Sequence, residues 1–207
     1  MFDSIHSAIF HLDRVFQKNF ILAVVLVLTG LSTNVYAKDS DLASRLSSRD
    51  YVLMMRHALA PGIGDPAEFK LNDCKTQRNL SEEGISQASR IGEWLKQQGI
   101  MSANVYSSPW CRTIDTAKLL GFGPVTSENS LASTFEEKNT ENINLGNLSE
   151  FVAKALKKKG SKALILVTHQ VNISAYAGMG VAAGDMVLVR VDRNGKVLSS
   201  APYSRPN

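Results

Sequence analysis

Two short apolar runs in the sequence each end in a histidine. Residues 51–55 form a run of strand length that ends in Arg56 and His57, and residues 163–168 form a second run that ends in His169. A buried strand delivers its last side chains to the edge of a sheet, where open α/β proteins bind their ligands. The repeated pattern predicts that both histidines lie at one site.

A second arginine follows another predicted strand. Residues 104–108 read as a strand that breaks at Pro109, and Arg112 opens the next helix, where unpaired backbone N–H groups attract anions. Guanidinium groups match phosphate oxygens two at a time, and a neutral imidazole is a nucleophile toward phosphorus. Taken singly, Arg56 and His57 are more simply interpreted as a surface ion pair and a packed neutral ring, and Arg112 as a solvated residue of a first helical turn. Together, Arg56, His57, Arg112 and His169 predict a site for phosphoryl chemistry.

The elements that position these residues follow from capping signals and hydrophobic spacing. The predicted elements after the first strand are helices from Ser81 to Gly99, from Arg112, at about 148–159 and from Gln170, and a closing hairpin over 186–191 and 196–198. The first helix is expected to serve packing alone. Residues 58–79 hold two prolines and two glycines and predict a long loop beside the site, and 121–147 predict a connecting or lid region.

The amino terminus has the layout of an export signal. Residues 20–31 carry no charge and follow Arg14 and Lys18, with small or neutral residues at 35–37. We expect a cleaved signal peptide over 1–37 and one domain over 38–207, which places the domain in the periplasm or outside the cell. The alternative is an anchor at 20–36, with the domain outside the cytoplasm and the membrane contacted through this segment alone.

Composition and charge narrow the classes of partner. The chain has 44% hydrophobic and 20% charged residues, and its net charge of +4 is too mild for a nucleic-acid-binding protein. No metal-ligand spacing is present, so neither a metal nor another cofactor is expected. The two cysteines, Cys74 and Cys111, form a disulfide or remain two buried thiols. Nothing in the sequence indicates an oligomeric state.

Three blocks of the sequence resemble the histidine phosphatase superfamily, also called phosphoglycerate mutase-like. The blocks are Arg56-His57-Ala58, residues 107–117 and Thr168-His169, with supporting similarity at 78–81 and 84–88. The resemblance runs from about residue 50 to about 191. With Gln170 after the late histidine, the chain resembles the mutase-like branch of this family. It is also similar to small exported bacterial members described as phosphatases of lipopolysaccharide core sugar phosphates.

The resemblance implies a fold and a set of roles. The expected fold is a three-layer α/β/α sandwich with a mostly parallel central sheet. His57 is expected to be the nucleophile that becomes phosphohistidine, and Arg56, Arg112 and His169 are expected to bind the phosphoryl oxygens. The general acid of this branch is a glutamate in the lid region, for which Glu136 is the first choice and Glu137 the second. Asp65 is a third choice on the first loop.

The expected activity is hydrolysis of a phosphomonoester. The expected substrate is an envelope sugar phosphate or another small-molecule or glycolipid phosphoester. Ala58 stands where the family has glycine, and a position that required positive φ would make its methyl group a cost to activity. A catalytically weak phosphate-binding envelope protein is therefore one alternative. A phosphomutase is the other, although only a short segment between Arg112 and His169 is left to supply a lid.

Overall fold

The computed structural model describes residues 41–135 and 141–203. The predicted signal peptide, Glu136 and Glu137 lie outside these described residues. Within the described part, no helix combines the length and the apolar character that crossing a bilayer requires.

Six strands form one mixed sheet in the order β3-β2-β4-β1-β5-β6. The strands are β1 Tyr51–Arg56, β2 Ala103–Ser107, β3 Val125–Ser127, β4 Ala163–Thr168, β5 Met186–Val191 and β6 Val197–Tyr203. The first four run parallel to one another, and β5 and β6 add an antiparallel edge. Arg56 of β1 is in register with Thr168 of β4. The two residues that follow, His57 and His169, therefore leave the sheet from adjacent strand ends.

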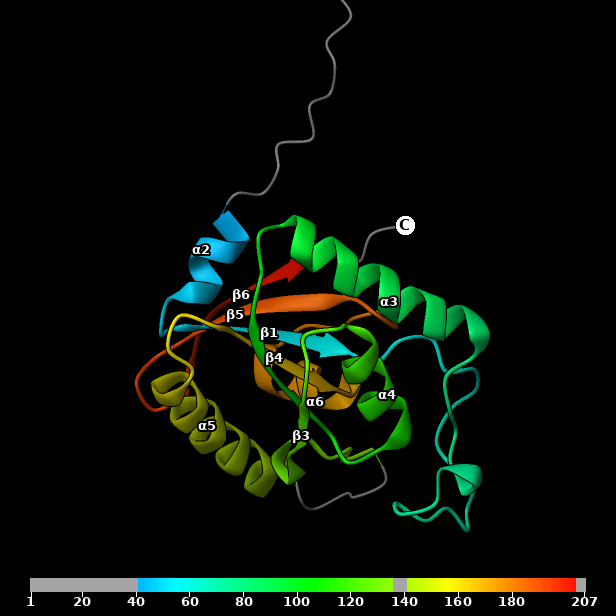
Figure 1. The fold of residues 1–207 in the computed structure, drawn as a ribbon. Coiled ribbons are helices and arrows are strands. Elements are labelled where there is room, and N and C mark those ends of the chain that lie inside the picture. Colours follow the sequence, from blue (N-terminus) through cyan, green and yellow to red (C-terminus); the bar gives the residue numbers. More distant parts are fainter. Residues whose placement is uncertain (1–40, 136–140, 204–207) are drawn as a thin grey trace, which may run out of the picture. The chain divides into compact units, whose positions relative to one another are not determined.

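Helices cover both faces of the sheet, which confirms the expected three-layer fold (Figure 1). The helices α2 Asp41–Ser47, α3 Glu82–Gln97 and α4 Cys111–Leu119 pack on one face, and α5 Glu141–Lys158 and α6 Gln170–Ala177 pack on the other. Alternate side chains of β1 enter the two cores: Leu53 and Met55 join the first, and Val52 and Met54 join the second. Residues 52–55 of this strand are buried and all apolar, as expected for a strand covered on both faces.

Helix α3 begins and ends close to where its sequence predicts. The Ser81 hydroxyl accepts a hydrogen bond from the Gly84 amide at 3.1 Å and caps the helix. Gly84 packs against the backbone of the segment that follows His57, because a Cβ at this position would lie 2.1 Å from the Leu59 carbonyl oxygen. The Gln87 amide oxygen accepts a hydrogen bond from Leu59 N at 2.9 Å. Beyond its packing role, α3 thus holds the backbone next to His57.

The structure adds elements that the sequence patterns do not indicate. Helix α2 has only 7 residues and lies before the first predicted strand, where the sequence patterns predict no helix. The region 121–147 contains β3 and the 3-10 helix η2 Asn129–Leu131, and α5 already begins at Glu141. The early turns of α5 are rich in asparagine and include Gly146, which are weak helix formers. Local propensity therefore predicts a helix that is shorter than the one observed.

Candidate active site

Arg56, His57, Arg112 and His169 line one cavity of about 520 Å³ at the carboxyl ends of β1, β2 and β4. Arg56 ends β1, and His57 and His169 follow β1 and β4 directly, whereas Arg112 is the second residue of α4. The structure thus brings together all four residues from distant parts of the sequence. The predicted acid Glu136 lies outside the described residues. In the described part of the chain, no cluster of three or more His, Cys, Asp or Glu side chains is suited to hold a metal ion.

The His57 ring is buried and oriented for attack through Nε2. Nδ1 lies 2.8 Å from the Ala58 carbonyl oxygen, and since a carbonyl only accepts, Nδ1 carries the proton and the Nε2 lone pair is free of it. Burial lowers the pKa of His57 to about 3, with Arg112, Arg56 and Arg78 acting in the same direction. The imidazole is therefore neutral across the physiological pH range, which is the nucleophilic form.

Ala58 fits its position without backbone strain. No described residue other than glycine has a positive φ, so the left-handed conformation considered for this position does not occur. The Ala58 amide donates to the Thr116 hydroxyl of α4 at 3.0 Å. The Ala58 side chain is fully buried. The change from glycine to alanine therefore gives no structural reason to expect a weak enzyme.

The two predicted arginines each have a buried Nε–H group without a partner in the part of the chain that the structure describes. Arg112 Nη1 donates to both Asp65 carboxylate oxygens at 2.9 and 3.0 Å, and Arg56 Nη1 donates to the Val181 carbonyl at 2.9 Å. The Nε atoms of both arginines are buried and find no acceptor among the described residues. Buried donors of this kind are rare and call for a ligand or other acceptor. The two groups belong to the same cavity as His57.

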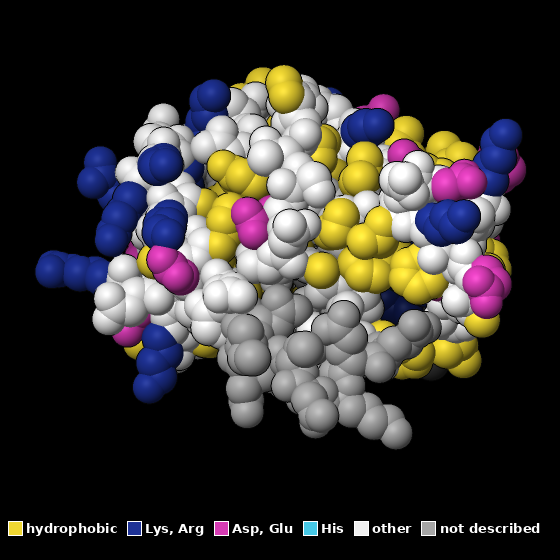
Figure 2. Space-filling view, turned by 90° about the horizontal axis from the view of Figure 1, so that it is seen from below, with side chains coloured by type: hydrophobic (Ala, Val, Ile, Leu, Met, Phe, Trp, Pro, Cys, Tyr) yellow, Lys and Arg dark blue, Asp and Glu magenta, His cyan; other side chains and the backbone are white. Residues whose placement is uncertain are grey.

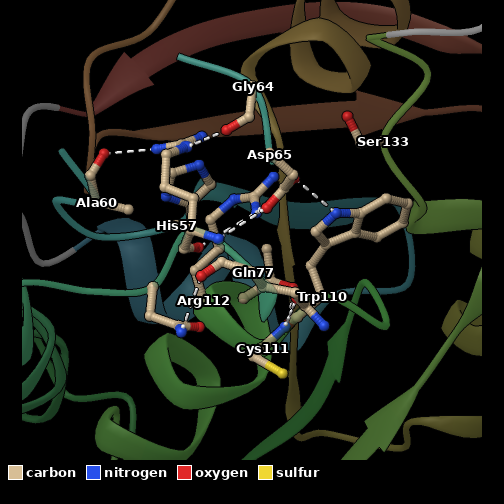
Figure 3. Close-up of polar contacts among 12 residues, drawn as sticks. His57, Ala60, Gly64, Asp65, Gln77, Trp110, Cys111, Arg112 and Ser133 are labelled. Atoms are coloured by element: carbon tan, nitrogen blue, oxygen red, sulfur yellow. Dashed lines mark hydrogen bonds and ion pairs between the residues drawn. The ribbon is translucent and has the colours of Figure 1, made fainter. Parts of the chain in front are cut away.

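Asp65 connects the long loop to the site (Figure 3). Besides the Arg112 guanidinium, its carboxylate accepts from the Trp110 indole N–H at 3.0 Å and from the Arg78 amide at 2.9 Å. Both oxygens accept hydrogen bonds, which is the geometry of an ionised carboxylate without a proton to give. Asp65 is therefore better suited to position Arg112 and Trp110 than to act as a general acid.

His169 is fixed between Arg112 and a serine. Arg112 Nη2 lies 3.4 Å from Nδ1, and because a guanidinium only donates, Nδ1 accepts and Nε2–H donates to the Ser108 hydroxyl at 2.8 Å. Its ring centroid lies 5.6 Å from that of His57. Burial lowers the pKa of His169 well below its usual range. Both ring nitrogens are engaged in this arrangement, so His169 supports Arg112 and stands beside the nucleophile.

Arg78 is a third guanidinium in the cavity, and the sequence reasoning did not place it in the site. Its Nε donates to the Gly64 carbonyl at 2.7 Å and its Nη1 donates to the Ala60 carbonyl. These two hydrogen bonds connect distant parts of the same loop through the Arg78 side chain. The residue comes just before the Ser81 cap of α3, a position that signals a helix start and nothing else. Only the path of the loop brings it back to the site.

Cys74 and Cys111 form a disulfide, which resolves the alternative that the sequence left open. The bond joins the 3-10 helix η1 Cys74–Thr76 in the long loop to the first residue of α4. Next to it, the Cys111 amide donates to the Gln77 side chain at 3.0 Å. The loop that carries Asp65 and Arg78 is thus tied to the helix that carries Arg112.

We expect loss of this disulfide to destabilise the protein. The bond closes a chain segment with a sequence separation of 37 residues, for which chain entropy predicts about 2–4 kcal/mol. Cys74→Ser should lower the melting temperature by roughly 5–15 °C, measured by circular dichroism, and reductant should lower that of the wild type alike while leaving the variant unchanged. Equal melting temperatures of variant and wild type under oxidising conditions would contradict this.

Acid should destabilise the protein through its buried histidines. The folded-state pKa of His57 is about 3, and the unfolded value is about 6.5. Below pH 6.5 the unfolded chain therefore binds a proton on His57 that the folded chain does not bind. Stability should therefore fall as the pH decreases, by about 2 kcal/mol from His57 alone between pH 7 and 5, and His169 acts in the same direction. Urea unfolding at both pH values measures the loss.

The matched control for the acid effect is His57→Asn, which removes one titrating ring. Its stability loss between pH 7 and 5 should be smaller than that of the wild type by about 2 kcal/mol. An identical loss in both proteins would mean that His57 is protonated in the folded state at pH 5.

Comparisons with known proteins agree with this geometry. Residues 52–141 match a family model described as the histidine phosphatase superfamily (branch 1). A search of curated protein sequences gives no match. Among solved structures, the chain is similar to the protein histidine phosphatase SixA complexed with tungstate, with 17% identity, a TM-score of 0.54, and coverage of 74% of this chain and 96% of that one.

Two mycobacterial structures are similar to the same extent. The product of the open reading frame Rv3214 from Mycobacterium tuberculosis has 16% identity and a TM-score of 0.53, with 75% of this chain and 96% of that one covered. The mycobacterial glucosyl-3-phosphoglycerate phosphatase Rv2419c has 14% identity and a TM-score of 0.52, with 75% and 98% covered. At these identities the likeness shows the fold, which is phosphoglycerate mutase-like.

Proposed function

We propose that this chain, in which residues 52–141 match the model of the histidine phosphatase superfamily, hydrolyses phosphomonoesters through a phosphohistidine on His57. One observation carries the proposal. Arg56 and Arg112, each with a buried Nε–H group that has no acceptor within the described residues, line the cavity that also holds the neutral His57 ring. A tetrahedral oxyanion bound by these donors would lie beside a nucleophile.

The reaction proceeds in two displacements. His57 Nε2 attacks phosphorus as the bond from phosphorus to the ester oxygen breaks, and the leaving oxygen takes a proton to become an alcohol. Water then attacks the phosphohistidine, the P–N bond breaks, and inorganic phosphate and neutral His57 are released. The Ala58 carbonyl accepts a hydrogen bond from the Nδ1–H group throughout and stabilises the charge that develops on the ring. The guanidinium groups stabilise the negative charge of the transferred group.

The proton for the leaving oxygen comes, in this proposal, from Glu136, with Glu137 as the alternative. The support is the resemblance, since both residues lie outside the described part of the chain. Asp65 is near the reacting groups, but its carboxylate is occupied by Arg112 and Trp110. We assign Asp65 the role of a positioning residue.

The proposal extends to an exported protein with a cleaved segment at 1–37. The Cys74–Cys111 disulfide supports export, because such bonds persist in oxidising compartments. A small-molecule or glycolipid phosphoester is the proposed substrate. Cell fractionation together with amino-terminal sequencing tests the assignment, and we expect a periplasmic or secreted form that begins near Lys38.

Hydrolysis of p-nitrophenyl phosphate by the purified full chain tests the activity. We expect release of p-nitrophenol and inorganic phosphate in equal amounts. We also expect inhibition by orthovanadate, which resembles the transition state of phosphoryl transfer. Tight vanadate binding without turnover would favour the phosphate-binding alternative. Transfer of the phosphoryl group to an added alcohol or sugar in preference to water would favour the mutase.

A further inference from the structure

The cavity is larger than a phosphoryl group requires, and one side of it is apolar. Its volume of about 520 Å³ lies in the range that accommodates a whole small ligand. Five large apolar side chains line it above the arginines, and we call them the apolar wall: Ile63, Phe69, Leu71, Trp110 and Phe135. The wall therefore faces the part of a substrate that extends beyond its phosphate.

Three members of the apolar wall are exposed to solvent. The exposed fractions are 89% for Ile63, 44% for Leu71 and 57% for Phe135. Only six large hydrophobic side chains are exposed in the described part of the chain, so half of them gather at this one cavity. Figure 2 shows apolar side chains grouped on one half of the face it draws. A scattered exposed hydrophobic residue is ordinary, but a group beside a binding site indicates recognition of an apolar ligand.

Two members of the wall, Phe69 and Trp110, are held in place by interactions with the long loop and with each other. The Trp110 indole N–H is bound to Asp65 at 3.0 Å, and the Trp110 and Phe69 ring centroids lie 6.0 Å apart. The Cys74–Cys111 bond fixes the loop next to Trp110. This part of the apolar surface is therefore formed before a ligand arrives, which reduces the entropy lost on binding.

The charged side chains of the cavity are mostly cationic. Three guanidinium groups, Arg56, Arg78 and Arg112, line it, and Asp65, already paired with Arg112, is the one acidic lining residue in the described part of the chain. The polar lining side chains other than these and the histidines are Ser133 and Gln170. A sugar would leave most of its hydroxyl groups without partners against such a wall, at a cost for each.

We propose that the preferred substrates are phosphate monoesters of an apolar alcohol, in which an alkyl, aryl or isoprenoid group lies along the apolar wall. The phosphate binds the guanidinium groups, and the hydrocarbon adjacent to the ester oxygen covers Ile63, Leu71 and Phe135. This inference rests on the proposed phosphatase activity and names its substrate class. It differs from the sugar phosphates considered from the sequence.

A chain-length series tests the proposal. The full chain is assayed for phosphate release from n-alkyl phosphates, from methyl to octyl and below their micelle concentrations, and from glycerol 3-phosphate and glucose 6-phosphate. We expect kcat/KM to rise about threefold to fourfold per added methylene until the wall is covered, the transfer free energy of a methylene. The two polar esters should be no better than methyl phosphate.

Variants of the wall provide the specific control. Ile63→Ser and Phe135→Ser should each lower the ratio of octyl to methyl kcat/KM at least tenfold. Met101→Ser removes a side chain that is 80% exposed and does not line the cavity, so this ratio should stay at the wild-type value. Calorimetric binding of octylphosphonate, which cannot be hydrolysed, gives a second measurement that needs no turnover.

The outcomes separate this inference from the activity on which it rests. Hydrolysis of every ester with no dependence on chain length would overturn the substrate class and leave the phosphatase intact. Absence of any hydrolysis, with octylphosphonate bound more tightly than methylphosphonate, would overturn the phosphatase and keep the apolar recognition. A flat series together with sedimentation on anionic vesicles that Ile63→Ser abolishes would make the wall a membrane contact, and the proposal would be wrong.

Discussion

Replacing His57 with asparagine should reduce kcat for p-nitrophenyl phosphate by a factor of about 10⁴ or more, the scale seen when a catalytic nucleophile is removed. Asparagine keeps a polar side chain that can still donate to the Ala58 carbonyl, so the loss reports the missing Nε2. The variant should fold, because the buried ring contributes no charge at neutral pH. Steady-state kinetics and a circular dichroism melt measure both properties on the same sample.

The covalent intermediate provides a direct readout of this role. Brief incubation with a ³²P-labelled ester followed by a denaturing quench should leave a label on the wild type that is stable to base and lost in acid, as expected for phosphohistidine. The label should map to His57 and be absent from His57→Asn. His169→Asn serves as the comparison, because it should slow turnover and still acquire the label. A label of undiminished amount in His57→Asn would remove the proposed mechanism.

Replacing Arg112 with methionine should reduce kcat/KM by about a thousandfold. The change removes the unpartnered Nε donor and the Nη2 group beside His169, and each oriented donor of this kind contributes about a hundredfold to a thousandfold. Arg112→Lys should recover little activity, because an ammonium group keeps the charge and lacks the planar pair of donors. Orthovanadate should bind both variants more weakly, which titration calorimetry measures.

Folding must be separated from catalysis in this experiment. Arg112→Met leaves the buried Asp65 carboxylate without its cation, which by itself costs about 3–5 kcal/mol of stability. The double variant Arg112→Met/Asp65→Asn removes both charges, so it should regain much of the stability and none of the activity. Arg90→Met, at an exposed position of α3, is the control for loss of a positive charge. Near wild-type kcat/KM in the double variant would show that Arg112 does not act on the phosphoryl group.

Sequence patterns predicted the half of the site that comes from strand ends. An apolar run predicts a buried strand, and the carboxyl ends of neighbouring parallel strands lie at the same edge of the sheet. The positions of His57 and His169 therefore follow from two local patterns. The helix start at Arg112 follows in the same way from the break at Pro109. In each case the information lies within about ten residues of the side chain concerned.

The other half of the site depends on how the loop at 58–79 folds back. Nothing near Asp65 in the sequence indicates that its carboxylate binds Arg112. Nothing near Arg78 indicates that it lines the same cavity as His57. The loop has no hydrophobic period, and its path is set by a disulfide, by Trp110 and by backbone carbonyls that become acceptors only in the folded protein. For the same reason Asp65 was considered as an acid, a role that its contacts disfavour.

Gly84 shows how a residue without any reactive group constrains the reaction centre. The nearest atoms to a Cβ at this position belong to the main chain of Leu59, two residues after the nucleophile. Main chain cannot rotate aside as a long side chain can. Any larger residue must therefore displace the peptide whose carbonyl is hydrogen-bonded to the His57 imidazole. Attempts to stiffen α3 by exchanging its glycines for alanine, a common route to heat resistance, should therefore spare position 84, because there the gain in rigidity would misalign the nucleophile.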